Sequence, residues 1–298
     1  MKKEIQDVQE GMARQGYIAE PSITTAVYLS QTLQKPLLIE GEAGVGKTEV
    51  AKVLARLLDT ELIRLQCYEG LDVHTALYEW NYQRQILRIR MAEKDGHDPG
   101  RMEEQIFTRD YLLERPLLRA ITKKDAAPVL LIDEIDRADE GFEAFLLELL
   151  SDFQVTIPEL GTIRAEHLPY VVLTSNRTRD ISDALRRRCL YLWIEHPSFE
   201  KEVAIIRTKV PNISEQLSRE ISRFMHGLRH KRLYKTPGVA ETLDWARALV
   251  MMHRDHLAED VIGETLGCLL KDSHDVRNLG EAELRTLAAE VERQETPL

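Results

Sequence analysis

A glycine-rich stretch, LLIEGEAGVGKTEV at residues 37–50, constrains the fold of this chain more than any other segment. The apolar run from Leu37 to Ile39 predicts a buried strand, and residues 48–58 predict a helix with one apolar face. The loop between them has the pattern G-x-x-x-x-G-K-[ST]. The residues that match this pattern are Gly41, Gly46, Lys47 and Thr48.

This loop is predicted to bind the phosphates of a nucleotide. Glycines let the backbone wrap an anion with its N–H groups, and the following helix N-terminus adds positive potential. Lys47 is expected to contact the outer phosphates, and the Thr48 hydroxyl to ligate Mg²⁺. The alternative is an ordinary glycine-rich turn, but strand, loop, Lys-Thr pair and helix all occur in order. The residues expected to bind the nucleotide here are Gly41, Glu42, Ala43, Gly44, Val45, Gly46, Lys47, Thr48 and Glu49.

A second motif, PVLLIDEIDRAD at residues 128–139, indicates which reaction the nucleotide undergoes. Its apolar run is typical of a strand buried on both faces of a parallel sheet. Asp133 at the end of this strand can hold Mg²⁺ beside Thr48. Glu134 can polarise a water molecule for attack on the γ-phosphate, which favours hydrolysis of ATP over transfer to a small acceptor. A surface acidic loop is the alternative.

Two further segments complete the predicted site. A strand at residues 170–174 ends next to Asn176, which we expect to lie between the first two motifs and to orient the attacking water. The run Arg186-Arg187-Arg188 precedes another predicted strand, residues 190–195. One interpretation of the run is a solvated helix end. The other is an arginine finger that reaches the γ-phosphate of a neighbouring subunit, which requires an oligomer.

Composition narrows the classes of function and the compartment. The formal net charge of −10 argues against a general polyanion binder. No run of about 18 apolar residues predicts a membrane span, and the segment MKKEIQDVQEG lacks an apolar signal core. The 3 cysteines are far apart, match no metal spacing and suit a reducing compartment. A cytoplasmic protein is therefore expected.

The order of these motifs resembles that of the AAA+ ATPases, in particular the MoxR family and its CoxD-like branch. The segments RLQCYEGLD, ALYEWNYQRQIL and LLERPLLRAI are similar to characteristic segments of that branch. The resemblance implies an α/β fold with a parallel five-stranded sheet flanked by helices, plus a smaller α-helical lid domain. It also implies ATP and Mg²⁺ as cofactors.

The resemblance assigns roles to individual residues. Lys47 and Thr48 match the Walker A positions, and Asp133 with Glu134 matches the Walker B pair. In the same way, Asn176 matches sensor 1, Arg188 best matches the arginine finger with Arg187 as the near competitor, and Tyr17 and Ile18 are candidates for the adenine pocket.

The domain boundaries expected from this resemblance are residues 1–198 for the ATPase domain and 199–298 for the lid. A helical insert at about 76–120 explains the long separation between Lys47 and Asp133. A helix is expected at 22–34, capped by Ser22 and with Leu33 pointing inward. A second is expected at 76–93 around Trp80, Ile86 and Ile89. Two more are expected at 102–113, ending near Pro116, and at 142–150. A hairpin is expected within residues 153–166.

The lid departs from the family pattern at one point. Where many relatives have a Pro-Arg pair that supplies the sensor 2 arginine, this chain has Pro237-Gly238. Arg232, Lys235 or Arg247 could substitute, or could be ordinary surface cations.

The first functional hypothesis is an ATP-hydrolysing AAA+ machine that acts on proteins. Resemblance to CoxD implies a chaperone-like factor that matures a molybdenum hydroxylase of the carbon monoxide dehydrogenase type. It also implies a von Willebrand A domain protein as a partner, and assembly as a homo-oligomer, expected to be a hexameric ring. The second hypothesis is a nucleic-acid-remodelling motor, for which the basic cluster Arg229, Lys231, Arg232 and Lys235 is the main feature. A third, a non-hydrolysing scaffold, conflicts with the intact Asp133-Glu134 pair.

Overall fold

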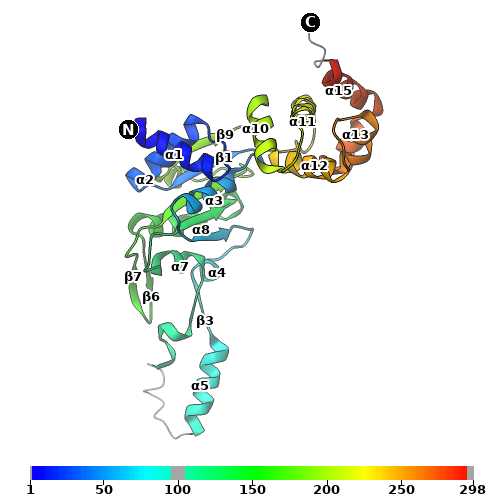
Figure 1. Ribbon diagram of the computed structural model, residues 1–298. Coiled ribbons are helices and arrows are strands. Elements are labelled where there is room, and N and C mark those ends of the chain that lie inside the picture. The colour runs from blue at the N-terminus through cyan, green and yellow to red at the C-terminus, as the bar shows by residue number, and fades with distance from the viewer. Residues whose placement is uncertain (1, 95–104, 294–298) are drawn as a thin grey trace. The chain divides into compact units, whose positions relative to one another are not determined.

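The computed structural model describes residues 2–94 and 105–293 (Figure 1). The chain forms two compact units, which we call the first and the second unit. The first comprises Met1–Gly11, Glu20–Glu40 and Thr48–Trp193, and the second comprises Met12–Ala19, Gly41–Lys47 and Ile194–Leu298. The phosphate loop therefore groups with the C-terminal part of the chain.

A five-stranded sheet with the order β2-β5-β8-β1-β9 organises the fold, as predicted. The neighbours β2–β5, β5–β8 and β8–β1 pair in parallel. Because β8 lies between β5 and β1, the strand that leads to Asn176 lies between the two motif-bearing strands, which confirms that expectation. The strands are β1 (Leu37–Gly41), β2 (Leu62–Gln66), β5 (Val129–Asp133), β8 (Tyr170–Ser175) and β9 (Leu190–Ile194).

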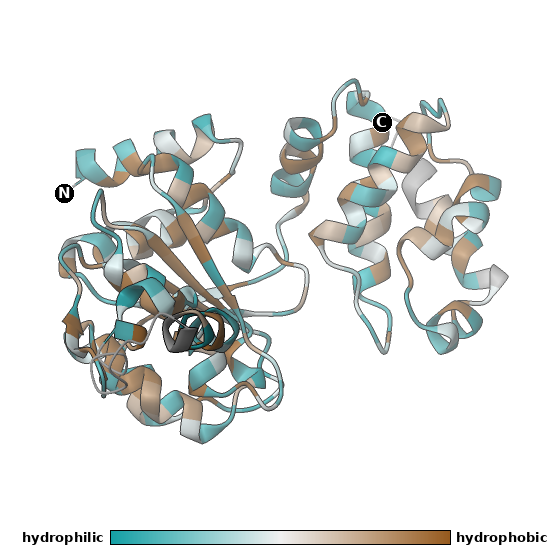
Figure 2. Cartoon of the chain, turned by 90° about the horizontal axis from the view of Figure 1, so that it is seen from below, coloured by the Kyte–Doolittle hydropathy of each residue, from teal (hydrophilic) through white to brown (hydrophobic). Residues whose placement is uncertain are grey.

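The central strands are buried because helices cover the sheet. Every residue of β1 and β5 is buried, as expected of parallel strands enclosed on both faces, and the strands appear as brown hydrophobic bands in Figure 2. Leu130, Ile132 and Leu173 lie in the main core with Phe142 and Leu146. The helices that fall wholly or mainly within the first unit include α1 (Lys2–Arg14), α2 (Pro21–Leu33), α3 (Lys47–Leu57), α7 (Pro116–Thr122), α8 (Glu140–Asp152) and α9 (Asp183–Arg188).

The start and the inward face of α2 differ from the prediction. Glu20 occupies the N-cap position and Pro21 the first turn, so the prediction that Ser22 caps the helix is wrong. Proline suits the first helical turn, since its fixed φ is already helical and its missing N–H would have no partner there. Leu33 is 53% exposed rather than inward, because the helix ends there and Gln34 turns left-handed.

The predicted helix over residues 76–93 is wrong in its first part. The segment forms α4 (Val73–Leu77), β3 (Tyr78–Trp80) and α5 (Tyr82–Lys94). β3 pairs antiparallel with β4 (Leu112–Glu114), which buries Trp80 opposite Leu112. A pairing with a segment this distant in sequence decides the backbone conformation and is invisible to local periodicity. The later part of the prediction is confirmed, since Ile86 and Ile89 lie on α5, where Ile86 is exposed.

The second half of the insert also differs from the prediction. Of the helix expected over 102–113, residues 102–104 lie outside the described part of the chain, and the described end forms the 3₁₀ turn η1 (Arg109–Tyr111) and then β4. Pro116 begins α7 rather than following a helix. In Figure 1, α5 extends beyond the β3–β4 ribbon, away from the five-stranded sheet.

The predicted helix and hairpin after the second motif are confirmed. Asp139 caps α8 by accepting a hydrogen bond from the Phe142 N–H. β6 (Gln154–Ile157) and β7 (Gly161–Arg164) then form an antiparallel hairpin around the turn at 158–160.

The C-terminal region is helical, as predicted, and no strand occurs among described residues 199–293. Its core surrounds Phe224 and Trp245, whose indole N–H donates to the Thr265 hydroxyl at 2.7 Å. Within the described ranges, no helix is both long and apolar enough to span a bilayer. The helices are α10 (Phe199–Lys209), α11 (Glu215–Arg229), α12 (Val239–Met251), α13 (Glu259–Thr265), η3 (Leu266–Cys268), α14 (Ser273–Asn278) and α15 (Glu281–Arg293).

Candidate functional site

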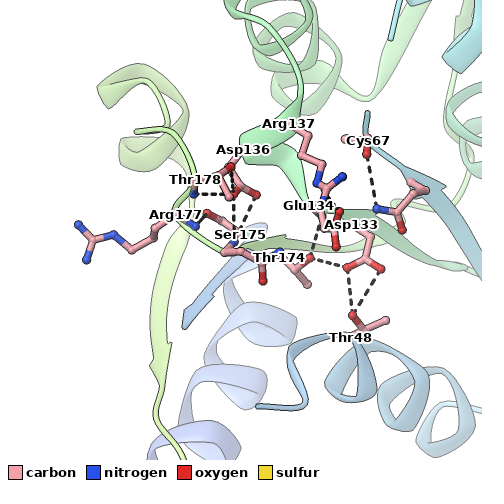
Figure 3. A network of polar contacts seen from close by, with 12 residues as sticks. Thr48, Cys67, Asp133, Glu134, Asp136, Arg137, Thr174, Ser175, Arg177 and Thr178 are labelled. Atoms are coloured by element: carbon pink, nitrogen blue, oxygen red, sulfur yellow. Dashed lines mark hydrogen bonds and ion pairs between the residues drawn. The ribbon is translucent and has the colours of Figure 1, made fainter. Parts of the chain in front are cut away.

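Asp133, at the end of β5, is the centre of a buried polar cluster in the first unit (Figure 3). The Thr48 hydroxyl donates to Asp133 Oδ1 at 3.1 Å, and the Thr174 hydroxyl donates to the same oxygen at 2.5 Å. Asp133 is only 2% exposed. We call Thr48, Asp133, Glu134 and Thr174 the acid cluster. The structure thus brings together the predicted metal ligands Thr48 and Asp133, which lie far apart in the sequence.

The spacing of Thr48 and Asp133 fits a shared Mg²⁺ ligand set. Octahedral Mg²⁺ binds oxygen at 2.0–2.1 Å, so neighbouring ligands lie about 3 Å apart. The two oxygens here lie 3.1 Å apart. Mg²⁺ bound there would neutralise charge on the β and γ phosphates.

Arg64 on β2 also contacts the acid cluster. No sequence pattern indicated this contact. The Nη2 and Nε atoms of Arg64 lie 2.6 Å and 3.0 Å from Asp133 Oδ2. Asp133 Oδ1 therefore accepts from the hydroxyls of Thr48 and Thr174, whereas Oδ2 is paired with a cation and lies 3.4 Å from the Thr48 hydroxyl. Arg64 is half exposed, so this pair can exchange with solvent.

Glu134 has an unusual backbone conformation. Its φ of 56° lies in the left-handed region, which few non-glycine residues adopt and which often marks functional sites. The Glu134 N–H donates to the Thr174 hydroxyl at 2.9 Å, and its Oε2 lies 2.7 Å from Arg137 Nε. The carboxylate that we expect to polarise water is thus held by an ion pair at the end of β5, and it is partly exposed.

Thr174 rather than Asn176 is the residue of this strand end that contacts Asp133. The backbone N–H of Asn176 instead donates to the Asp136 carboxylate, at 3.2 Å to each oxygen. Thr178 donates to the same carboxylate from its N–H and its hydroxyl, at 2.9 Å and 2.7 Å. Asp136 therefore ties the segment after β8 to the segment after β5, and it was not singled out from the sequence. The water-orienting role of Asn176 remains a prediction.

Cys67 borders the acid cluster without being reactive. Its backbone N–H donates to the carbonyl of Asp133 at 2.8 Å. Burial, and then the nearby Asp133 charge, raise the pKa of its thiol to about 12. The thiol stays protonated at neutral pH, so Cys67 supports β5 rather than acting as a nucleophile.

The phosphate loop has its lysine folded over it. Lys47 is buried, and its Nζ donates to the carbonyls of Gly41 at 2.8 Å and Glu42 at 2.5 Å. Lys47 begins α3 and Thr48 follows it, so the helix fixes the lysine beside the first residue of the acid cluster. Glu49, one residue on, pairs with Arg56 at 3.0 Å on the surface of α3.

The other residues predicted to bind the nucleotide differ in how far they are exposed to solvent. Val45 is buried and Gly46 half-buried, whereas Glu42, Ala43 and Gly44 are exposed. Tyr17 and Ile18, the candidates for the adenine pocket, are half-buried between α1 and α2 and belong to the second unit, as does the loop.

The three consecutive arginines of α9 have different environments. Arg186 pairs with the buried Glu40 at 2.8 Å, and the Tyr191 hydroxyl donates to the same carboxylate at 3.0 Å. Burial and this hydrogen bond raise the pKa of Tyr191, so its phenol stays a donor. Arg187 and Arg188 are exposed. The arginine-finger role of Arg188, with Arg187 as the competitor, remains a prediction.

A phosphate loop after β1 and an acid pair after β5, with β8 between these strands, define a phosphate-loop nucleoside triphosphatase. The family comparison makes this more specific. The chain belongs to the AAA domain family, dynein-related subfamily, whose family model matches residues 36–189. It is an AAA+ ATPase that binds and hydrolyses ATP.

Several known proteins are similar to this chain. The gas vesicle ATPase GvpN of Haloferax mediterranei is 23% identical over 267 residues, which cover 84% of this chain and 74% of GvpN. An uncharacterized protein of Staphylococcus epidermidis is 24% identical over 225 residues, 73% of this chain and 76% of that protein. The chaperone protein ClpB of Chlamydia trachomatis is 26% identical over 158 residues, which are 50% of this chain but only 15% of ClpB.

Among solved structures, the Thermotoga maritima RuvB Holliday junction branch migration motor is similar at 18% identity and a TM-score of 0.48. The match covers 95% of this chain and 82% of that one. This likeness bears on neither substrate nor partner.

Replacing Glu134 with glutamine is expected to slow ATP turnover roughly a hundredfold while ATP still binds, because glutamine keeps the shape but cannot accept a proton. Calorimetry and a phosphate-release assay on the same sample measure the two effects. Glu140→Gln, at an exposed position of α8, is the matched control. Turnover near the wild-type rate in Glu134→Gln would remove Glu134 from the mechanism.

Thr174→Val tests the residue that the sequence analysis missed. Valine has nearly the same shape but takes away the donor to Asp133 and the acceptor for the Glu134 N–H. Looser placement of both carboxylates is expected to lower turnover roughly tenfold or more. Thr162→Val in the β6–β7 hairpin, which removes an exposed hydroxyl pair, is the control. Equal turnover in the two variants would show that Thr174 has no positioning role.

Proposed function

We propose that this chain is a chaperone-like AAA+ ATPase that uses ATP hydrolysis to remodel a protein client. The acid cluster carries the proposal, because Asp133 and Glu134 are both present and both held in place by hydrogen bonds. A chain with this pair is equipped to hydrolyse ATP repeatedly rather than only to bind it. Lys47 would bind the outer phosphates, Thr48 and Asp133 would hold Mg²⁺, and Glu134 would accept the proton of the attacking water.

The inserted segment supports a protein as the client. α5 carries large apolar side chains that are more than half exposed, and exposed apolar clusters typically mark protein contacts. Its arginines, including Arg84 and Arg88, favour a client surface that is both apolar and acidic. The exposed apolar residues of α5 are Tyr82, Ile86, Leu87 and Met91.

The name of one relative supports a protein client, since ClpB is named a chaperone protein. The more specific form of the proposal follows the resemblance of the chain to CoxD. In that form, the chain assembles as a hexameric ring in the cytoplasm. The ring helps to mature a molybdenum hydroxylase of the carbon monoxide dehydrogenase type, together with a von Willebrand A domain protein.

The structure weakens the feature that favoured a nucleic-acid motor. Arg229, the first member of the basic cluster, is buried and forms a bidentate ion pair with Glu202 at 2.7 Å and 2.8 Å. Three basic residues of the cluster remain, on a chain whose formal net charge is −10. A strongly basic stripe along a nucleic-acid path is the usual footprint of such a motor.

A trapping experiment tests the client. The Glu134→Gln chain is expected to hold ATP and to retain its client, so we predict that it captures a specific protein from cells of its source in the presence of ATP. Lys47→Ala combined with Glu134→Gln is the control, because a chain that cannot bind ATP should capture nothing. A further variant, Leu87→Glu in the Glu134→Gln chain, tests whether α5 contacts the client. It should reduce capture without changing ATP binding.

The identity of the captured molecule decides between the hypotheses. A molybdenum hydroxylase or a von Willebrand A domain protein supports the specific proposal, and a different protein supports only the general one. ATP-dependent capture of nucleic acid, with no protein retained, would contradict the proposal and favour the motor hypothesis.

A further inference from the structure

Within the second unit, the phosphate loop contacts the end of β9, the segment that follows β9 and the start of α12. A Cβ atom at Gly41 would overlap the carbonyl oxygen of Ile194, so the two backbones are in direct contact. The Glu42 carboxylate lies 2.9 Å from His196 Nε2. A third contact, between Gly44 and the start of α12, is the closest to the middle of the loop.

The third contact requires glycine on both sides. A Cβ atom at Gly238 would lie 2.6 Å from the Cα of Gly44 and 2.8 Å from its carbonyl oxygen, distances that real side chains do not show. Gly44 has a φ of +77°, which also favours glycine. The Val239 N–H donates to the Gly44 carbonyl at 2.9 Å, across the same contact.

The turn that bears Gly238 is itself fixed by a buried ion pair. Arg229 Nε donates to the Pro237 carbonyl at 2.9 Å, while the rest of its guanidinium group is paired with Glu202. The Glu241 carboxylate accepts the Gly238 N–H at 2.9 Å. The backbone at 237–239 is thus held from both sides, so the loop contacts a rigid surface.

This contact sets the direction of one peptide group of the loop. In a trans peptide the C=O and the following N–H point in opposite directions. Because the Gly44 carbonyl points at Val239, the N–H of Val45 points away from α12. Backbone N–H groups of such loops are the donors to phosphate, so a helix of the lid region orients one of them.

We propose that Gly238 is a positioning residue for the nucleotide. A backbone contact between α12 and Gly44 holds the phosphate loop in its binding shape. Arg247, one of the lid cations considered from the sequence, is paired with Asp244 at 2.9 Å. The proposal rests on ATP binding at the phosphate loop.

Two variants break the contact in different ways. Gly238→Ala places a methyl group against the Gly44 backbone. Val239→Pro removes the N–H donor, at the first position of α12 where proline is tolerated, after a residue already in an extended conformation. We expect affinity for ADP and ATP to fall about tenfold or more in Gly238→Ala and severalfold in Val239→Pro.

The matched controls change the same residue types elsewhere in the second unit. Gly263→Ala, on α13, adds a methyl group where nothing lies within 4 Å. Glu215→Pro places proline at the first position of α11, after the extended Ser214. Both controls should bind nucleotide as the wild type does. Circular dichroism on all four variants checks that the helices remain folded.

Hydrogen exchange in the absence of nucleotide gives a second readout. The amides of residues 41–48 should exchange faster in Gly238→Ala and Val239→Pro than in the wild type or the controls. Wild-type affinity in both folded variants would overturn the positioning role, even with faster loop exchange. A wild-type chain that bound no nucleotide would overturn this proposal and the assignment of the phosphate loop together.

Discussion

Replacing Arg188 with alanine is expected to lower ATP turnover roughly a thousandfold and to leave ATP binding intact. Arg188 is exposed at the end of α9, whereas Arg186 is paired with Glu40 inside its own chain. An arginine that acts on the γ-phosphate of a neighbouring chain neutralises charge that develops only in the transition state, so its loss affects rate and not affinity.

A mixture of two inactive variants tests whether the site is shared. An interface that pairs the intact Glu134 of an Arg188→Ala chain with the intact Arg188 of a Glu134→Gln chain has a complete site. The mixture should therefore recover part of the activity once subunits exchange. Normal turnover in Arg188→Ala would disprove the assignment, and loss of turnover in Arg187→Ala alone would transfer the role to Arg187.

Lys47→Ala is expected to abolish measurable ATP binding, a loss of at least about a hundredfold in affinity. Its ammonium group is the point charge expected to meet the β and γ phosphates, and it already lies against the loop carbonyls of Gly41 and Glu42. Isothermal titration calorimetry measures the affinity. Lys52→Ala, at an exposed position of the same helix, is the control.

Folding must be checked separately, because Lys47 is buried. Thermal unfolding of Lys47→Ala should remain cooperative, since the strands around the loop are held by apolar packing rather than by this lysine. Tight ATP binding by a folded Lys47→Ala chain would contradict the assignment of the phosphate loop.

The sheet could be predicted from sequence because its signals are local. The apolar runs that became β1, β5 and β8 are short, continuous and followed by polar residues at one end. The motif at 41–48 is rarely found outside phosphate-binding loops, so it predicts a strand before it and a helix after it. Asp133 could be predicted to lie beside Thr48 because the carboxyl ends of parallel strands share one edge of the sheet.

What could not be predicted depends on contacts between distant segments. Arg64 and Thr174 reach Asp133 only because β2 and β8 flank β5. The order of strands in the sheet cannot be predicted from the residues of a single strand. Trp80 lies in a strand because residues 112–114 pair with it. The contact of Gly238 with Gly44 likewise joins a loop and a helix that lie far apart in the sequence.

Phosphate release from ATP shows whether this chain hydrolyses ATP with its phosphate loop and acid cluster. The assay uses the purified wild-type chain with Mg²⁺, and Lys47→Ala and Glu134→Gln are measured in parallel. We expect steady turnover by the wild type, no ATP binding and no turnover by Lys47→Ala, and bound ATP with roughly hundredfold slower turnover by Glu134→Gln. Phosphate release at the same rate in all three samples, or none from a wild-type chain shown to bind ATP, would contradict this expectation.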